Sequence, residues 1–88
     1  MEMKAMYYYY NAVNKSVGYY LDLVDALHGE PKDIEHLNEL ATEDEKIRFC
    51  EDVNINCYIS KNKNDLLDIM QSMLISNFDE LKQELLKL

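Results

Sequence analysis

The 88-residue chain contains no tryptophan, one proline, one arginine and only two glycines. So little glycine and proline leaves few sites for the tight turns of an all-β sandwich or barrel, and the composition therefore favours helices. Long apolar runs are also missing, because no stretch approaches the ~20 apolar residues of a membrane-spanning helix. Lys4, Asn11 and Asn14 interrupt the N-terminal stretch where a secretion signal would be apolar. We therefore expect a cytoplasmic protein with no membrane partner.

Residues that carry chemistry are few and scattered. Cys50 and Cys57 are six residues apart, a spacing that fits neither a CxxC metal pair nor a secreted disulfide framework. His28 and His36 form no HxxxH or HExxH motif, and a zinc site built from the two histidines and the two cysteines has no spacing to support it. The chain also lacks a glycine-rich phosphate loop and a nucleophile elbow. We expect no catalytic residues, no metal and no cofactor, and hence a protein that is not an enzyme.

The acidic charge is concentrated in one window of the sequence. Eleven of the seventeen acids but only three of the nine bases lie between residues 22 and 52, so this window carries the whole net charge of −8. Such a protein repels nucleic acid and anionic membranes and is attracted to basic partners. The one basic cluster, Lys61 and Lys63, supplies too few phosphate contacts for a helix-turn-helix DNA-binding protein. We expect no direct binding of nucleic acid.

Hydrophobic spacing predicts a single, mainly α domain over residues 1–88. From residue 5 to residue 28 apolar side chains recur at alternating steps of four and three, which is typical of a long amphipathic helix. Gly29 then suits the position after a helix and Pro31 the start of the next one. The seam consists of Met6, Tyr10, Val13, Val17, Tyr20, Val24 and Leu27.

The second half of the chain predicts shorter helices and one further long helix. A helix from Pro31 is followed by a capping box, Thr42 with Glu45, that opens another helix over residues 43–51. Alternating apolar residues over 53–60 favour a strand, and a hairpin pairing 47–50 with 55–59 is the alternative to this third helix. After a loop at 61–64 with Asn64 as cap, one apolar stripe runs to Leu88, with a kink near Ser76 left open.

The predicted fold therefore has two long amphipathic helices packed antiparallel with short helices between them. A small β-hairpin within residues 47–59 would make the fold α+β instead. Three tyrosines project from the expected first helix, and glutamates at 35, 39 and 43 would form a like-charged row at i, i+4 spacing. The residues expected to bind a partner are Tyr7, Tyr8, Tyr19, Asp33, Glu35, Glu39, Glu43, Asp44 and Glu45.

These features favour a small acidic inhibitor or interaction protein that binds a basic surface of a larger protein, including a surface that normally holds DNA. Frequent Asn, Lys, Ile and Tyr indicate an AT-rich gene, as in low-GC bacteria and their phages. The expected setting is then a phage or mobile element acting in its host's cytoplasm. Anti-CRISPR and anti-restriction inhibitors, DNA mimics and immunity proteins share this physics. The alternative is a homo-oligomeric helical adaptor, such as a homodimer, in which the acids serve only solubility.

Overall fold

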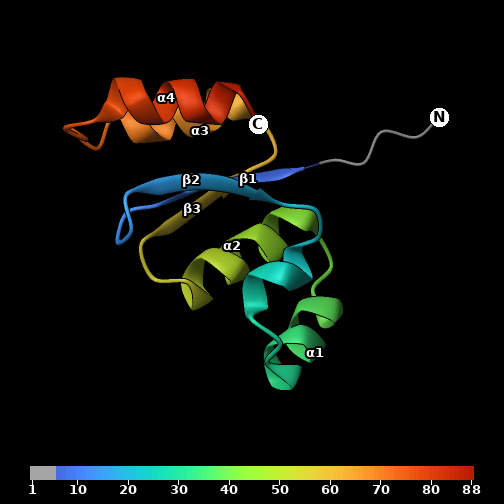
Figure 1. Cartoon of the computed structure of the whole chain (residues 1–88). Helices are drawn as coiled ribbons and strands as arrows, with labels where there is room; N and C mark the ends of the chain where they lie inside the picture. Colours follow the sequence, from blue (N-terminus) through green and yellow to red (C-terminus); the bar gives the residue numbers. More distant parts are fainter. Residues whose placement is uncertain (1–5) are drawn as a thin grey trace.

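Three antiparallel strands lie at the centre of the computed structural model, which describes residues 6–88 (Figure 1). The strands are β1 (Tyr7–Asn11), β2 (Ser16–Tyr20) and β3 (Cys57–Ser60), in the spatial order β2-β1-β3. β1 is the central strand, and it pairs with β2 through a tight turn and with β3 from the second half of the chain. β2 and β3 are therefore the two edges of the sheet.

Helices cover both faces of this sheet. One face carries the 3₁₀ helix η1 (Leu23–Leu27) together with α1 (Pro31–Glu39) and α2 (Glu43–Val53). The opposite face carries α3 (Lys63–Gln71) and α4 (Phe78–Leu86). Each face has its own buried cluster, the first containing Leu27, Leu37 and Cys50 and the second containing Tyr10, Met70 and Leu85. The molecule is thus a three-layer α+β domain.

The N-terminal hairpin forms because an aromatic run meets an asparagine turn. Four consecutive tyrosines end at Asn11, and aromatic residues favour a pleated, half-buried strand. The Asn11 Oδ1 atom accepts hydrogen bonds from the amides of Val13 (2.9 Å) and Asn14 (3.0 Å), which closes the turn. Lys15 completes the turn with a φ of 54°. The two strands then pair from Asn11 with Ser16 to Tyr7 with Tyr20.

The helix predicted over residues 5–28 is wrong, and residue 5 itself lies outside the described part of the chain. Residues 7–20 form the hairpin, and only 23–27 are helical, as a 3₁₀ turn. Successive tyrosines are buried on opposite faces, Tyr9 against the first cluster and Tyr10 against the second. Because both faces of the hairpin are covered, no clean alternation of polar and apolar residues marks it as strand.

The helix expected over residues 43–51 is confirmed by α2. Its alternative, a hairpin of 47–50 with 55–59, is wrong, because residues 47–50 belong to α2 and β3 pairs with β1 instead. The last apolar stripe is not one helix, since α3 and α4 are separated by a turn in which Leu74 has a φ of 56°. The fold is therefore α+β, not a mainly α pair of long antiparallel helices.

The local helix signals in the middle of the chain are confirmed. Pro31 lies at the start of α1. The Thr42 hydroxyl accepts from the Glu45 amide at 3.2 Å, which is the N-cap bond of a capping box, and it also donates to the Glu45 carboxylate at 3.0 Å. In the 61–64 loop the capping residue is Asn62, not Asn64, because Asn62 Oδ1 accepts from the amides of Asn64 and Asp65.

Candidate functional site: an acidic layer

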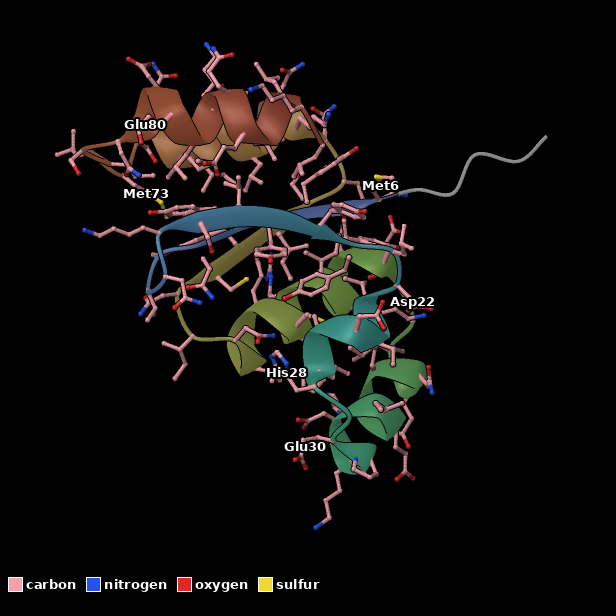
Figure 2. The ribbon with its side chains drawn as sticks, in the orientation of Figure 1. Met6, Asp22, His28, Glu30, Met73 and Glu80 are labelled. Atoms are coloured by element: carbon pink, nitrogen blue, oxygen red, sulfur yellow. The ribbon has the colours of Figure 1, made fainter. Side chains whose placement is uncertain are left out.

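The acidic window of the sequence folds as one layer of the molecule. Residues 22–52 comprise η1, α1, α2 and their connections, all on the same face of the sheet. We call this part the acidic layer. Asp22 and Glu30 lie within it in Figure 2, whereas Glu80 lies on α4 across the sheet. The concentration of charge along the sequence is therefore also a concentration of charge in space.

Almost none of this charge is neutralised inside the molecule. Over residues 6–88 the one ion pair joins the Lys61 ammonium to the Glu43 carboxylate at 3.0 Å, and the two side chains are 41% and 44% exposed. The other ten carboxylates of the acidic layer therefore have no basic partner within the described part of the chain. Like charges that are held together without counter-charges raise the local negative potential.

Glu43 holds α2 to the sheet. Its carboxylate accepts a hydrogen bond from the Tyr7 hydroxyl at 3.1 Å in addition to the Lys61 ion pair. The hydrogen bond from Lys61, supported by that from Tyr7, lowers the pKa of Glu43. Burial and the contact with Glu43 raise the pKa of Tyr7. The Glu43 carboxylate and the Tyr7 hydroxyl therefore already have hydrogen-bond partners inside the molecule, so neither is fully available to bind another protein.

The predicted acids divide into free and engaged groups. α1 ends at Glu39, so Glu35 and Glu39 do not continue into a row with Glu43. Glu35, Glu39 and Asp44 are exposed, and no hydrogen bond or ion pair joins their carboxylates to residues 6–88. Asp33 is half-buried and Glu45 is occupied by the capping box. The free carboxylates of the predicted set are therefore those at 35, 39 and 44.

The predicted tyrosines do not form one patch with these acids. Tyr7 faces the acidic layer, but Tyr8 and Tyr19 are cross-strand partners on the opposite face of the sheet. The Lys63 ammonium lies 5.2 Å from the centre of the Tyr8 ring, a cation–π contact. Tyr19 is 44% exposed. Tyr8 and Tyr19 are thus neighbours, and they lie away from the acidic layer.

The cysteine and histidine side chains are buried or contact neighbouring side chains of the fold. Cys50 and Cys57 are buried, and burial raises the pKa of each thiol to about 11, so both stay protonated at neutral pH. A thiol that is not ionised is a poor nucleophile. The His28 Nε2 atom lies 2.7 Å from Asn54 Oδ1, and the His36 ring packs against Phe49. Among residues 6–88 no three acidic, histidine or cysteine side chains are grouped to hold a metal.

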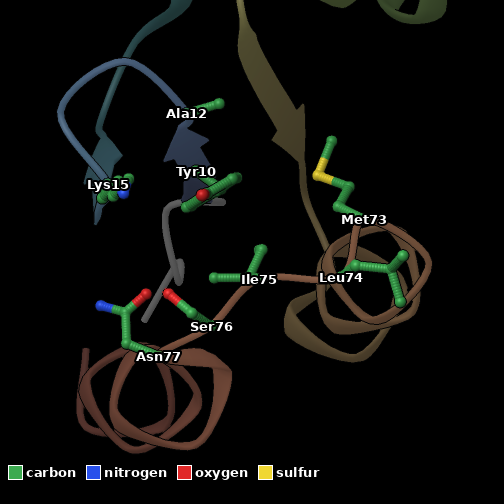
Figure 3. Close-up of a pocket in the computed structure, with 8 residues that line it drawn as sticks. All are labelled: Tyr10, Ala12, Lys15, Met73, Leu74, Ile75, Ser76 and Asn77. Atoms are coloured by element: carbon green, nitrogen blue, oxygen red, sulfur yellow. The ribbon is translucent and has the colours of Figure 1, made fainter.

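A second feature, which the sequence pattern missed, lies where loops meet at one end of the sheet. A cavity of about 350 Å³ opens between the β1–β2 turn and the α3–α4 turn (Figure 3). Tyr10, Lys15 and Ile75 are among its lining residues. The Asn77 Oδ1 atom, also in the lining, is buried without a hydrogen-bond partner in residues 6–88. The cavity could accept an apolar group that carries a hydrogen-bond donor.

The loops around this end expose three large apolar side chains. Val13 is 66%, Ile55 77% and Leu74 94% exposed. A backbone hydrogen bond of 2.8 Å from Ala12 to Asn56 ties the first two loops together. Asparagines flank Val13 and Ile55 closely in the sequence, and this turn signal could have marked both as exposed loop tips.

No helix in the described part of the chain is both long enough and apolar enough to cross a membrane. Comparison with protein-family models, curated proteins and solved structures finds no match to this chain. The function therefore has to be argued from the surface of the molecule.

Proposed function

We propose that this protein is a small interaction protein that inhibits or occupies a larger protein by docking its acidic layer onto a basic, nucleic-acid-handling surface. The observation that carries the proposal is the single layer of carboxylates with almost no internal ion pairs. Carboxylates on a rigid frame can take the places of phosphates, and opposite fields accelerate association. In this proposal the protein acts by binding and not by catalysis.

The uneven distribution of charge argues for binding over solubility. Residues 61–88, which form α3, α4 and the loops beside them, carry five acids and four bases and are close to neutral. Solubility alone would be served equally well by acids spread over both layers. Repulsion among the unpaired carboxylates also lowers the stability of the fold. A basic partner would relieve that repulsion.

The test compares two triple charge reversals of equal size. The first, Glu35→Lys with Glu39→Lys and Asp44→Lys, changes the free carboxylates of the acidic layer. The matched control, Asp68→Lys with Asp79→Lys and Glu84→Lys, changes exposed carboxylates of α3 and α4. Each set contains one residue in the first turn of a helix, so the helix-dipole penalties are balanced.

Tagged wild-type protein and both variants are used for affinity purification from a low-GC bacterial lysate at low and high salt, followed by mass spectrometry. We expect the wild type and the α3–α4 variant to retain the same basic protein and the acidic-layer variant to lose it. High salt should release it, because surface charges are screened beyond ~10 Å at 0.1 M ionic strength. Equal retention of that protein by all three proteins would rule out the acidic layer as the binding surface.

The narrower proposal, a mimic of DNA acting in a phage's host cytoplasm, has its own measurement. The purified partner should bind either duplex DNA or this protein but not both, so DNA should displace it competitively. A ternary complex with DNA would leave the acidic-layer docking in place and exclude the mimic. The alternative, a homo-oligomeric helical adaptor, was argued from a helical seam that does not form, since residues 7–20 are a hairpin and 23–27 a 3₁₀ turn.

A further inference from the structure

The two edges of the sheet differ in whether their outward backbone groups have hydrogen-bond partners. At the β3 edge the Ile59 amide donates to the Glu51 carboxylate at 2.8 Å, and the Cys57 amide donates to the Asn54 carbonyl at 2.9 Å. α2 and the loop that follows it therefore cover the outward donors of β3. Natural proteins commonly protect edge strands from pairing with other chains in this way.

The hydrogen-bond alternation identifies the groups exposed at the β2 edge. In an antiparallel sheet the backbone N–H and C=O groups of successive residues point to opposite sides of the strand. The Ala12 amide bonds to Asn56, so the backbone groups of Tyr10 and Tyr8 also point to β3, and those of the residues between them point to β2. Opposite those intervening residues, Ser16, Gly18 and Tyr20 of β2 bond inward. The amides and carbonyls of Val17 and Tyr19 must then point outward from β2.

Nothing in residues 6–88 covers these outward groups. No recorded hydrogen bond reaches the amides of Val17 or Tyr19. The strand Ser16–Tyr20 has no lysine, no proline and no bulge, which are the usual devices that block pairing at an edge. Figure 1 looks onto the sheet nearly edge-on, with β2 in front of β1 and β3 and no helix drawn across it. The β2 edge is therefore open to another strand.

We propose that β2 pairs antiparallel with β2 of a second copy of this chain, which joins the two sheets into one of six strands. An axis through Gly18 sets the register, so that Val17 of one protomer faces Tyr19 of its partner and the reverse pair forms by symmetry. Both outward residues then exchange their amide and carbonyl hydrogen bonds. The self-complementarity of this five-residue strand favours a second copy over an unrelated strand.

The side chains suit this register. Val17 and Tyr19 both lie on the face of the sheet that carries α3 and α4, because each pairs with a residue of the second cluster, Tyr10 and Tyr8. Across the new junction each protomer would place a β-branched side chain beside an aromatic one, a favourable cross-strand pair. On the other face Gly18 would lie opposite Gly18, with the Tyr9 hydroxyl of each protomer close over its own Gly18, and Ser16 would face Tyr20 of the partner subunit.

This inference does not depend on the proposed function, and salt separates the two. A twofold axis normal to the sheet puts both acidic layers on one side, and each layer carries a formal net charge of −8. Their repulsion weakens the dimer at low ionic strength, so added salt should tighten self-association. Docking of the acidic layer on a basic partner has the opposite salt dependence.

The first experiment is sedimentation equilibrium of the full chain over a range of concentrations up to about 1 mM, the affinity of the weakest useful dimers. Val17→Pro and Tyr19→Pro each remove one outward donor per protomer but no bond to β1, a position where edge strands tolerate proline. We expect each to raise the dimer dissociation constant about 30-fold, since symmetry deletes two hydrogen bonds. Val17→Thr and Tyr19→Phe keep the amides and should dimerise like the wild type.

A second experiment tests the register without relying on proline. In the double variant Val17→Cys with Tyr19→Cys, each new cysteine faces its counterpart at a Cα separation of about 5.5 Å, within reach of a disulfide. Mild oxidation should crosslink the double variant and neither single variant, because identical positions are about 7 Å apart along the strand. Monomeric behaviour at every concentration, or a dimer that both proline variants leave intact, overturns the proposal. A monomer would leave the β2 edge for a strand of another protein.

Discussion

The contact between Tyr9 and Gly18 makes Gly18→Ala the sharpest test of the N-terminal hairpin. A Cβ atom at Gly18 would lie 2.5 Å from the Tyr9 hydroxyl oxygen and 2.6 Å from ring atom Cζ. The ring cannot move freely, because it stacks on Tyr20 with centroids 4.7 Å apart. In a helix over residues 5–28, by contrast, Gly18 would lie on the polar side and alanine would stabilise the chain by about 1 kcal/mol. The two structures therefore predict opposite signs.

The magnitude follows from two opposing terms. Overpacking of this kind costs about 1–3 kcal/mol. Replacing glycine by alanine within a strand returns about 0.5–1 kcal/mol through the lower entropy of the unfolded chain. The net expectation is a loss of about 0–2.5 kcal/mol in the free energy of unfolding, with a middle value of about 1 kcal/mol. For a domain of this size, each kcal/mol corresponds to a decrease of about 4–8 °C in the melting temperature.

Urea unfolding of a double-mutant cycle measures this coupling. Gly18→Ala is compared in the wild type and in a Tyr9→Ala background, where the ring is absent. We expect the substitution to be neutral or mildly stabilising in that background, with a coupling energy of about 1–3 kcal/mol between the two positions. If Gly18→Ala stabilises the otherwise unchanged chain by about 1 kcal/mol, the ring does not lie over Gly18 and the hairpin is refuted.

Two further predictions concern caps and alkaline pH. Asn62→Ala should reduce the free energy of unfolding by about 1 kcal/mol while Asn64→Ala changes it little, because Asn62 Oδ1 is the acceptor at the start of α3; equal losses in thermal melts would contradict this. The free energy of unfolding should fall between about pH 9 and 11. In the unfolded chain the thiols of Cys50 and Cys57 have a pKa of 9.0, whereas in the folded protein burial raises the pKa of each to about 11. The unfolded state therefore binds fewer protons than the folded state in this window, and rising pH favours it. The double variant Cys50→Ala with Cys57→Ala should flatten that slope in melts across this pH range, and an unchanged slope would assign it to other groups.

Signals contained within a few residues predicted the structure well. Pro31 at the start of α1 and the capping box at Thr42 act through adjacent backbone groups, and they place α1 and α2 whatever surrounds them. The concentration of acids between residues 22 and 52 is visible in the sequence. That these residues form one layer was not predicted, because it depends on the sheet against which their helices pack.

Elements defined by long-range contacts were not predictable from spacing. Both faces of β1 are buried, so alternate tyrosines give no polar side by which to recognise a strand, and the four-three count of a helix fits equally well. The stripe at the C-terminus continues across the turn because α3 and α4 pack on the same face, through Leu67 and Leu81 among others. Leu74 fits that stripe in sequence yet is 94% exposed. Periodicity counts apolar residues but does not reveal which of them are buried.

Docking through the acidic layer should weaken as salt is added, whereas dimerisation through the β2 edge should strengthen. These opposite salt dependences limit the conditions under which both occur together. Pairing through β2 would bring two acidic layers to the same side of a six-stranded sheet, where their mutual repulsion grows as salt is removed. A basic partner that spans both layers neutralises that repulsion, so partner binding and dimerisation should favour each other by linkage. Without such a partner, the charge that speeds docking disfavours the dimer. The prediction is therefore a chain that is more monomeric when free at low salt and more dimeric when its acidic layers are occupied.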